Sequence, residues 1–198
     1  RRNERIMVAI ERGLEATTKL QKRHENVPRD RGGWRYLRKS TSSPDSDLSV
    51  TTWHLLFLRA AKNAGFQVPQ SMVDDAAEFV RRCYNPDGRM FAYLPGSRGT
   101  ITMTGAGVLC LNLAGRFDDQ SMKAGGRTLG DYDFANFDPD KLSWPYYTCY
   151  HSSQAANQLD GETRRSVLTG IAGWLLDEQR HDGRWPEIGR GARSGGEV

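Results

Sequence analysis

Long apolar runs are missing from this sequence of 198 residues, although a helix that crosses a membrane needs about 20 consecutive apolar residues. The sequence therefore predicts no membrane span. Only three cysteines are present, Cys83, Cys110 and Cys149, and no two of them form a CxxC pair. An odd number of cysteines in separate predicted helices is not a disulfide framework, so we expect buried free thiols, which slightly favours the cytoplasm. The chain starts without methionine, so we expect a processed or trimmed start, and a removed signal peptide leaves the compartment open.

A clustered basic face is also missing, although the net charge is +4. Proteins that bind nucleic acids collect lysine and arginine on one face or along one helix. Here these residues are scattered, and the denser stretches, 29–38 and 184–193, lie among the glycines and prolines of predicted loops. The sequence also lacks a glycine-rich phosphate loop after a strand and the Gly-x-Ser-x-Gly turn of serine hydrolases. We therefore expect no nucleic-acid partner.

Helical periodicity is what the sequence has in abundance, and it comes in two alternating kinds. Three stretches carry a one-sided apolar stripe that is typical of amphipathic helices with one face in water: 6–20, 73–83 and 167–178. Three stretches between and beside them are apolar or small on nearly all sides, as in helices that protein covers: 50–64, 102–113 and 147–159. Strand signals are scarce. The alternation predicts an all-α fold with two concentric layers, in which the second set of helices lies inside the first.

The connections between these helices repeat as well, which indicates a repeat protein. A glycine, any residue and a bulky apolar side chain recur at 32–34, 88–90, 130–132 and 183–185. Each glycine is expected to take the left-handed conformation that ends an outer helix. Hydroxyl-rich segments follow and start the inner helices, but no inner helix follows the fourth turn. We therefore predict a single domain over residues 1–198, with about four repeats and the last one incomplete.

The last turn carries the fullest pattern. An aromatic–aliphatic pair, Trp174-Leu175, precedes Gln179, and Gly183 and Trp185 follow. This pattern resembles the glutamine–tryptophan (QW) repeat of the prenyltransferase and squalene oxidase family, which includes terpenoid cyclases and protein prenyltransferases. The resemblance implies an α/α toroid, a ring of concentric helical hairpins around a cavity, which is here partial or open.

Looser copies of the repeat extend the resemblance over nearly the whole chain. Gln21 precedes a Gly-Gly-Trp turn after a longer loop, and a second copy has Tyr84 in place of the glutamine and Met90 in place of the tryptophan. The resemblance assigns a structural role to the following residues: Gln179, Gly183, Trp185, Gly33, Trp34 and Gly88. An incomplete ring leaves an open repeat edge, so we expect either a longer native chain or self-association through that edge.

Asp45 and Asp47 lie where the first inner helix is expected to start. They are similar to the acidic motif with which class II isoprenoid cyclases protonate an alkene or epoxide, and the resemblance makes Asp47 the proton donor. Such chemistry needs a carboxylic acid that keeps its proton beside a second carboxyl group. Leu48 stands where the family has a further acid. The alternative is helix capping, in which Ser46 or Asp47 accepts the N–H groups of the first turn.

The stretch 146–151 is similar to the zinc-site segment of protein prenyltransferase β-subunits. Tyr147 stands where that segment has its histidine, and the sequence contains no Asp-x-Cys pair to supply further ligands. Because a catalytic zinc normally has three protein ligands, we predict no metal and no other cofactor. His54 and His151 lie in predicted inner helices, where each is either a cavity residue or a hydrogen-bonded interior histidine.

The toroid interpretation places a cavity or cleft between the inner helices. The residues expected to line it are Thr51, His54, Thr104, Tyr147, Tyr150 and His151. We expect a non-catalytic binding or scaffolding module, with a small apolar or isoprenoid-like ligand or a protein as its partner. A cyclase-type isomerase that uses Asp47 and Asp45 is the first alternative, and a carbohydrate-active toroid is the second.

Overall fold

The computed structural model describes residues 2–21, 28–36 and 46–189. This part of the chain forms seven α-helices, one short 3-10 helix and one two-stranded hairpin, which confirms the predicted all-α class. The helices are α1 (Arg2–Leu20), α2 (Leu48–Asn63), α3 (Gln70–Arg82), α4 (Ile101–Leu113), α5 (Gln120–Asp131), α6 (Pro145–Ala156) and α7 (Gly161–Glu178). The hairpin pairs β1 (Tyr84–Asn85) with β2 (Met90–Phe91), and the 3-10 helix η1 spans Pro139–Lys141.

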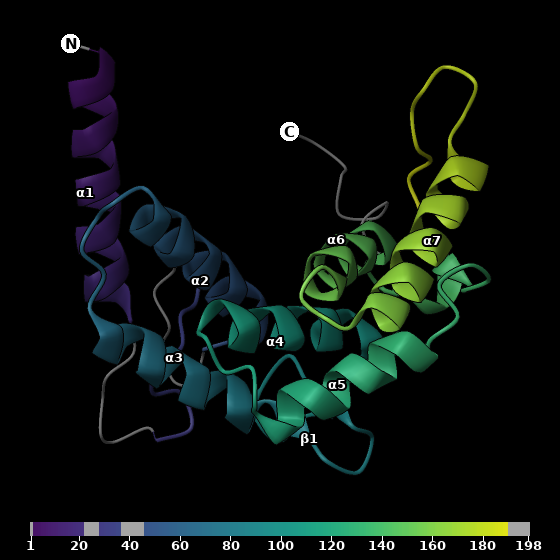
Figure 1. Cartoon of the computed structure of the whole chain (residues 1–198), viewed down its shortest axis with the longest axis horizontal. Coiled ribbons are helices and arrows are strands. Elements are labelled where there is room, and N and C mark those ends of the chain that lie inside the picture. The colour runs from purple at the N-terminus through teal and green to yellow at the C-terminus, as the bar shows by residue number, and fades with distance from the viewer. Residues whose placement is uncertain (1, 22–27, 37–45, 190–198) are drawn as a thin grey trace.

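The helices form two rows. Figure 1 shows α4 at the centre between α2 and α6, with α3 and α5 along the lower side and α1 and α7 at opposite ends. We call α2, α4 and α6 the inner row, and α1, α3, α5 and α7 the outer row. Each inner helix packs on neighbours in both rows. The central helix α4, for example, contacts α2 and α6 of the inner row and α3 and α5 of the outer row. The chain thus alternates between the rows, in the order that the sequence indicated.

The middle of the inner row agrees with its sequence pattern more closely than the ends do. All residues of α4 from Ile101 to Asn112 are buried, as expected for a helix without a polar face. Residues 55–58 of α2 include none that is exposed. Trp53 of α2 and Tyr150 of α6 are exposed, however, because α4 covers α2 and α6 from one side only.

The outer helix α1 packs less than its apolar stripe predicts. Thr17 is buried and Leu14 packs against the core, but Ile6 and Leu20 are exposed. The neighbouring Met7 and Val8 are exposed too, so the N-terminal half of α1 has little contact with α2. By contrast, α3 buries a full apolar face that includes Met72, Phe79 and Val80, as its stripe predicts.

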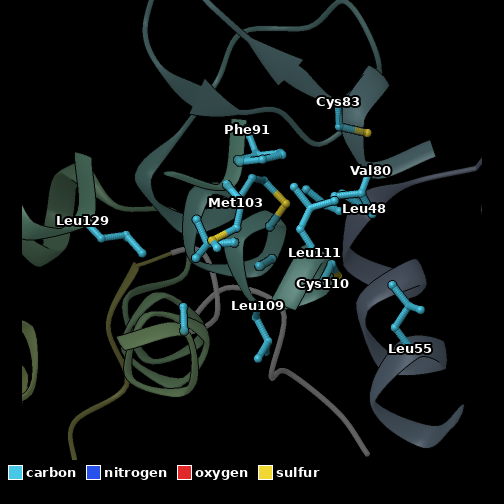
Figure 2. Packing of buried hydrophobic residues seen from close by; sticks show 14 of the residues in the cluster. Leu48, Leu55, Val80, Cys83, Phe91, Met103, Leu109, Cys110, Leu111 and Leu129 are labelled. Carbon is cyan, nitrogen blue, oxygen red and sulfur yellow. The ribbon is translucent and has the colours of Figure 1, made fainter. Parts of the chain in front are cut away.

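The core lies around α4 (Figure 2). Glycines allow this close packing: a Cβ on Gly107 would lie 2.3 Å from Cγ of Phe91, and one on Gly125 of α5 would lie 2.9 Å from Val108. All three cysteines are free and buried, which confirms the sequence prediction. Within the described ranges, no helix is both long and apolar enough to cross a membrane.

The first tryptophan turn is held by a glutamine from the end of α1. The Gln21 Nε2 atom donates to the Gly32 carbonyl at 3.1 Å, and Gly32 has a φ of +89°. The Trp34 indole Nε1 donates to the carbonyl of Thr17 at 2.9 Å. The backbone N–H of Trp34 donates to Oγ1 of Thr51 in α2 at 3.1 Å. These bonds join the end of an outer helix to the start of the following inner helix.

The last tryptophan turn repeats the first two of these bonds. Gln179 Nε2 donates to the carbonyl of Gly183 at 2.8 Å, and Gly183 has a φ of +82°. Trp185 Nε1 donates to the carbonyl of Leu175 at 2.8 Å. Leu175 precedes Gln179 by four residues, as Thr17 precedes Gln21. The glutamine and the tryptophan of the repeat therefore have the same partners at both ends of the chain.

The two middle turns differ from the repeat pattern that the sequence predicted. In the second turn, the left-handed residue is Arg89, with a φ of 51°, and not Gly88. Phe91, and not Met90, takes the place of Trp34, because the Phe91 N–H donates to Thr104 Oγ1 at 3.1 Å. The predicted repeat was therefore one residue out of register there. In the third turn, Gly130 lies inside α5 and does not end it.

Candidate functional site

A cleft of about 310 Å³ opens at the N-terminal ends of the inner-row helices. Its described walls come from the first turns of α2, α4 and α6 and from the segments that follow the first two turns. They are mostly aromatic: Tyr36, Ser49, Tyr93, Met103, Trp144 and Tyr147. Tyr147 is the predicted cavity residue that the structure places in this cleft.

The helix starts beside the cleft are not capped alike. Asp47 caps α2 by accepting the Val50 N–H at 2.8 Å, and Thr100 caps α4 by accepting the Met103 N–H at 3.2 Å. The N-cap residue of α6 is Trp144, whose side chain makes no capping hydrogen bond. Helix N-termini carry a positive potential, which the Asp47 carboxylate compensates at α2.

Asp47 is fully buried, and both its oxygens are engaged. Oδ1 accepts the N–H of Val50, while Oδ2 pairs with Nη1 of Arg35 at 2.5 Å. Arg35 also donates to the Tyr93 hydroxyl at 2.9 Å. The capping interpretation of Asp47 thus describes its contacts, although the residue is not at the surface. Asp45, its predicted carboxyl partner, lies outside the described residues.

Two tyrosines of the cleft wall, Tyr93 and Tyr147, are neutral phenols at pH 7. Burial raises the pKa of Tyr93 to about 12, and the negative charge of Asp47 acts in the same direction. Burial also raises the pKa of Tyr147 to about 12, although the nearby Ser49 acts against it. The Tyr147 hydroxyl is buried and has no hydrogen-bond partner of normal geometry in the described part of the chain. The cleft therefore offers aromatic surface and uncharged hydroxyl groups.

His151 lies behind Tyr147, one helical turn further along α6. It is fully buried, its ring centroid lies 4.1 Å from that of Tyr147, and Trp53 and Tyr150 complete its aromatic surroundings. Burial lowers the pKa of His151 to about 4, so the ring is neutral at pH 7. Neither ring nitrogen bonds to a described residue. Tyr150 itself is exposed and stacks on Trp53.

The other three residues predicted to line the cavity lie elsewhere. Thr51 and Thr104 are fully buried and accept the backbone N–H groups of Trp34 and Phe91. Their hydroxyls hold the turns to the inner helices, which is the physical reason for the hydroxyl-rich helix starts. His54 stacks on Trp34 at 4.8 Å, and its Nδ1 lies 3.4 Å from Thr17 Oγ1. It therefore faces α1, and burial lowers its pKa to about 4.

Five of the six described wall residues were not predicted from the sequence, and two of them had a usable signal. Tyr36 follows Trp34 by two residues, and Tyr93 follows Phe91 by two, so they occupy the same position of the repeat. The register error at Met90 hid this correspondence. Within the described ranges, no group of three or more histidine, cysteine or acidic side chains is placed to hold a metal ion.

Comparisons with known proteins were made for the sequence and for the structure. No family model matches the sequence, and neither the curated proteins nor the solved structures give a match.

Proposed function

We propose that the chain is an arc of an α/α toroid of the terpenoid cyclase and protein prenyltransferase kind, and that it is a non-catalytic binding module. Its ligand is a small apolar, isoprenoid-like molecule, which occupies the cleft at the N-terminal ends of α2, α4 and α6. The observation that carries this proposal is the wall of the cleft. Aromatic side chains that follow the first and second repeat turns lie there beside the start of α6, which no side chain caps.

The chemistry of the wall favours an apolar body with one neutral polar group. Tyrosine, tryptophan and methionine side chains provide the apolar contact that ligand pockets use, and the volume of about 310 Å³ suits a small molecule. The Tyr147 hydroxyl, which has no hydrogen-bond partner of normal geometry among the described residues, can hydrogen-bond an alcohol. A short isoprenoid alcohol combines these properties.

The contacts of Asp47 support binding without catalysis. A cyclase proton donor must present its carboxyl group to the substrate, whereas both carboxyl oxygens of Asp47 are bonded within the protein, one to the Val50 N–H and the other to Arg35. A glycosidase needs two carboxyl groups across the cleft, about 5–10 Å apart. None of the described residues that line this cleft carries a carboxyl group.

Farnesol is the probe that tests the proposal. We expect saturable binding in isothermal titration calorimetry, with an affinity lowered about tenfold or more by Trp144→Ala. Phe117→Ala removes an exposed aromatic side chain that is not among the described residues of the cleft wall, and it serves as the matched control. Absence of saturable farnesol binding, or equal loss in both variants, would contradict the proposed site.

A second measurement separates binding from catalysis. The protein is incubated with squalene and with geranylgeranyl diphosphate, and the products are analysed by gas chromatography and mass spectrometry. We expect no cyclised product from either substrate. A cyclised product that disappears in Asp47→Asn would identify Asp47 as a proton donor and overturn the non-catalytic proposal.

A further inference from the structure

A second pocket lies at the C-terminal ends of α2 and α4, opposite the ends that form the cleft. The second half of α2, the end of α4 and the start of α3 surround it, and its volume is about 220 Å³. Most of the described side chains that line it are apolar: Leu55, Leu58, Val68, Val73, Leu113 and Ala114. Close-packed interiors have few gaps larger than a water molecule, so a pocket of this size has room for a small ligand.

Two basic residues of α2, Arg59 and Lys62, also line the pocket and are exposed. They are three residues apart, so they are neighbours on one face of the helix. Neither side chain forms a salt bridge or a hydrogen bond with a residue of the described chain. Asp74, which follows the lining residue Val73 in α3, pairs instead with Arg116 at 2.6 Å. The two positive charges beside the pocket are therefore not compensated by a described acidic side chain.

The ends of the helices do not account fully for these charges. Basic residues near a helix C-terminus offset its negative potential, and at the ends of α1 and α3 such residues have acidic partners as well. Lys19 pairs with Glu15, and Arg81 pairs with Asp119. The C-terminal ends of α2 and α4 together carry about one negative elementary charge, whereas the two basic residues of α2 carry two positive charges. A net positive potential therefore remains at the pocket.

We propose that this pocket binds a short-chain carboxylate, a ligand with an apolar tail and one negative charge. The tail contacts the leucine and valine side chains, and the carboxylate group lies between Arg59 and Lys62. Arginine and lysine bind carboxylates through charge-assisted hydrogen bonds, which are stronger than those between neutral groups. A neutral ligand would fill the apolar part of the pocket but leave the two neighbouring positive charges uncompensated. The complementary charge thus selects an anion.

Hexanoate is the probe, because a pocket of about 220 Å³ holds about seven groups of the size of a water molecule, roughly 30 Å³ each. The full protein is labelled with 13C in its leucine and valine methyl groups and titrated in NMR. We expect the methyl resonances of Val68 and Val73 to shift to saturation, with a dissociation constant on the order of 1 mM. Hexan-1-ol, which lacks the charge, and acetate, which lacks the tail, should each bind about tenfold more weakly or worse.

Two double variants test the role of the basic residues. Arg59→Gln with Lys62→Gln removes both charges and should lower the hexanoate affinity about tenfold, while binding of hexan-1-ol stays unchanged. Arg164→Gln with Arg165→Gln removes two exposed charges from α7 that do not line the pocket, so it is the matched control and should bind hexanoate normally. Circular dichroism checks that both variants are folded.

Three results would overturn the proposal. They are the absence of a saturable shift of the Val68 and Val73 methyl groups, equal affinity for hexanoate and for either hexan-1-ol or acetate, and equal loss of affinity in the two double variants. No described residue lines both this pocket and the cleft, so the farnesol titration succeeds or fails independently of these results.

Discussion

Trp34 and Trp185 form the same local structure in two different surroundings. Each donates its indole N–H to a carbonyl near the end of an outer helix, and each follows a left-handed glycine that a glutamine holds. Trp34 is fully buried, while Trp185 is nearly half exposed. The difference is the inner helix that follows: α2 covers Trp34, and no described helix covers Trp185.

The comparison separates what a repeat motif does from what its neighbours do. The turn at Gly183 has the same glutamine and tryptophan bonds as the first turn, although none of the described helices covers it. Burial of the ring comes from the next helix, and burial of a large aromatic side chain contributes more free energy than one hydrogen bond. We therefore expect equivalent substitutions in the two turns to differ widely in their effect on stability.

The largest difference is expected for the two left-handed glycines. A Cβ on Gly32 would lie 1.9 Å from the carbonyl oxygen of Asp75, whereas a Cβ on Gly183 meets no atom within 4 Å. Gly183→Ala should lower the free energy of unfolding by about 1–2 kcal/mol, the cost of a left-handed alanine. Gly32→Ala adds a backbone clash and should lower it by about 4 kcal/mol or more. Urea denaturation measures both, and equal losses would contradict the structure of the first turn.

The tryptophans themselves test the contribution of the covering helix. Trp34→Ala should lower the free energy of unfolding by about 3–5 kcal/mol, because it empties a fully buried site. Trp185→Ala loses the matching indole hydrogen bond but little buried surface, so about 1–2 kcal/mol is expected. The difference between the two values is the contribution of α2. If Trp185→Ala were as destabilising as Trp34→Ala, Trp185 would be covered in solution.

A smaller effect should appear as a pH dependence of the free energy of unfolding, which comes from the structure around Trp34. Burial lowers the pKa of His54 to about 4, against 6.5 for an unfolded histidine, so the unfolded chain binds more protons between these values. Stability from this group is complete above about pH 6.5 and is lost as the pH falls towards 4. Its slope reaches at most about 1.4 kcal/mol per pH unit.

His54→Phe keeps a ring on Trp34 but does not titrate, so it should flatten the acid limb of the stability curve. His151, whose pKa burial also lowers to about 4, should give a second contribution of the same sign, which His151→Phe removes. Denaturation midpoints between pH 4 and pH 7 measure these slopes. Identical curves for the unaltered protein and His54→Phe would show that His54 is exposed or charged in the folded state.

Much of the fold was predictable because it depends on local patterns. The apolar stretch 102–113 gave the buried helix α4, and the glutamine with its Gly-x-Trp turn gave the bonded turns at both ends. The second turn was placed one residue out of register because Gly88 looks like the left-handed residue in the sequence. In the structure Arg89 takes that conformation, and Phe91 rather than Met90 packs on Gly107.

The candidate site was harder to predict, because its contacts join residues far apart in the sequence. Nothing near Asp47 indicated that Arg35 pairs with it, since the two residues are 12 positions apart in the sequence. Thr51 and Thr104 looked like cavity residues because they are polar in apolar helices, but a buried hydroxyl first satisfies nearby backbone groups. His54 faces α1 because of the way α2 is rotated about its own axis. The periodicity of the sequence leaves this rotation open where both sides of a helix are apolar.

Because the chain alternates between two rows, each helix packs mainly on helices one or two positions away along the chain. Such a chain has nearest-neighbour energetics, in which the ends fray before the middle and stability grows with each added unit. In this protein α1 has few contacts beyond α2, whereas α4 is enclosed by four other helices. Amide hydrogen exchange should therefore run as a gradient, fastest in the N-terminal half of α1 and slowest at Val108–Leu111, where exchange requires complete unfolding.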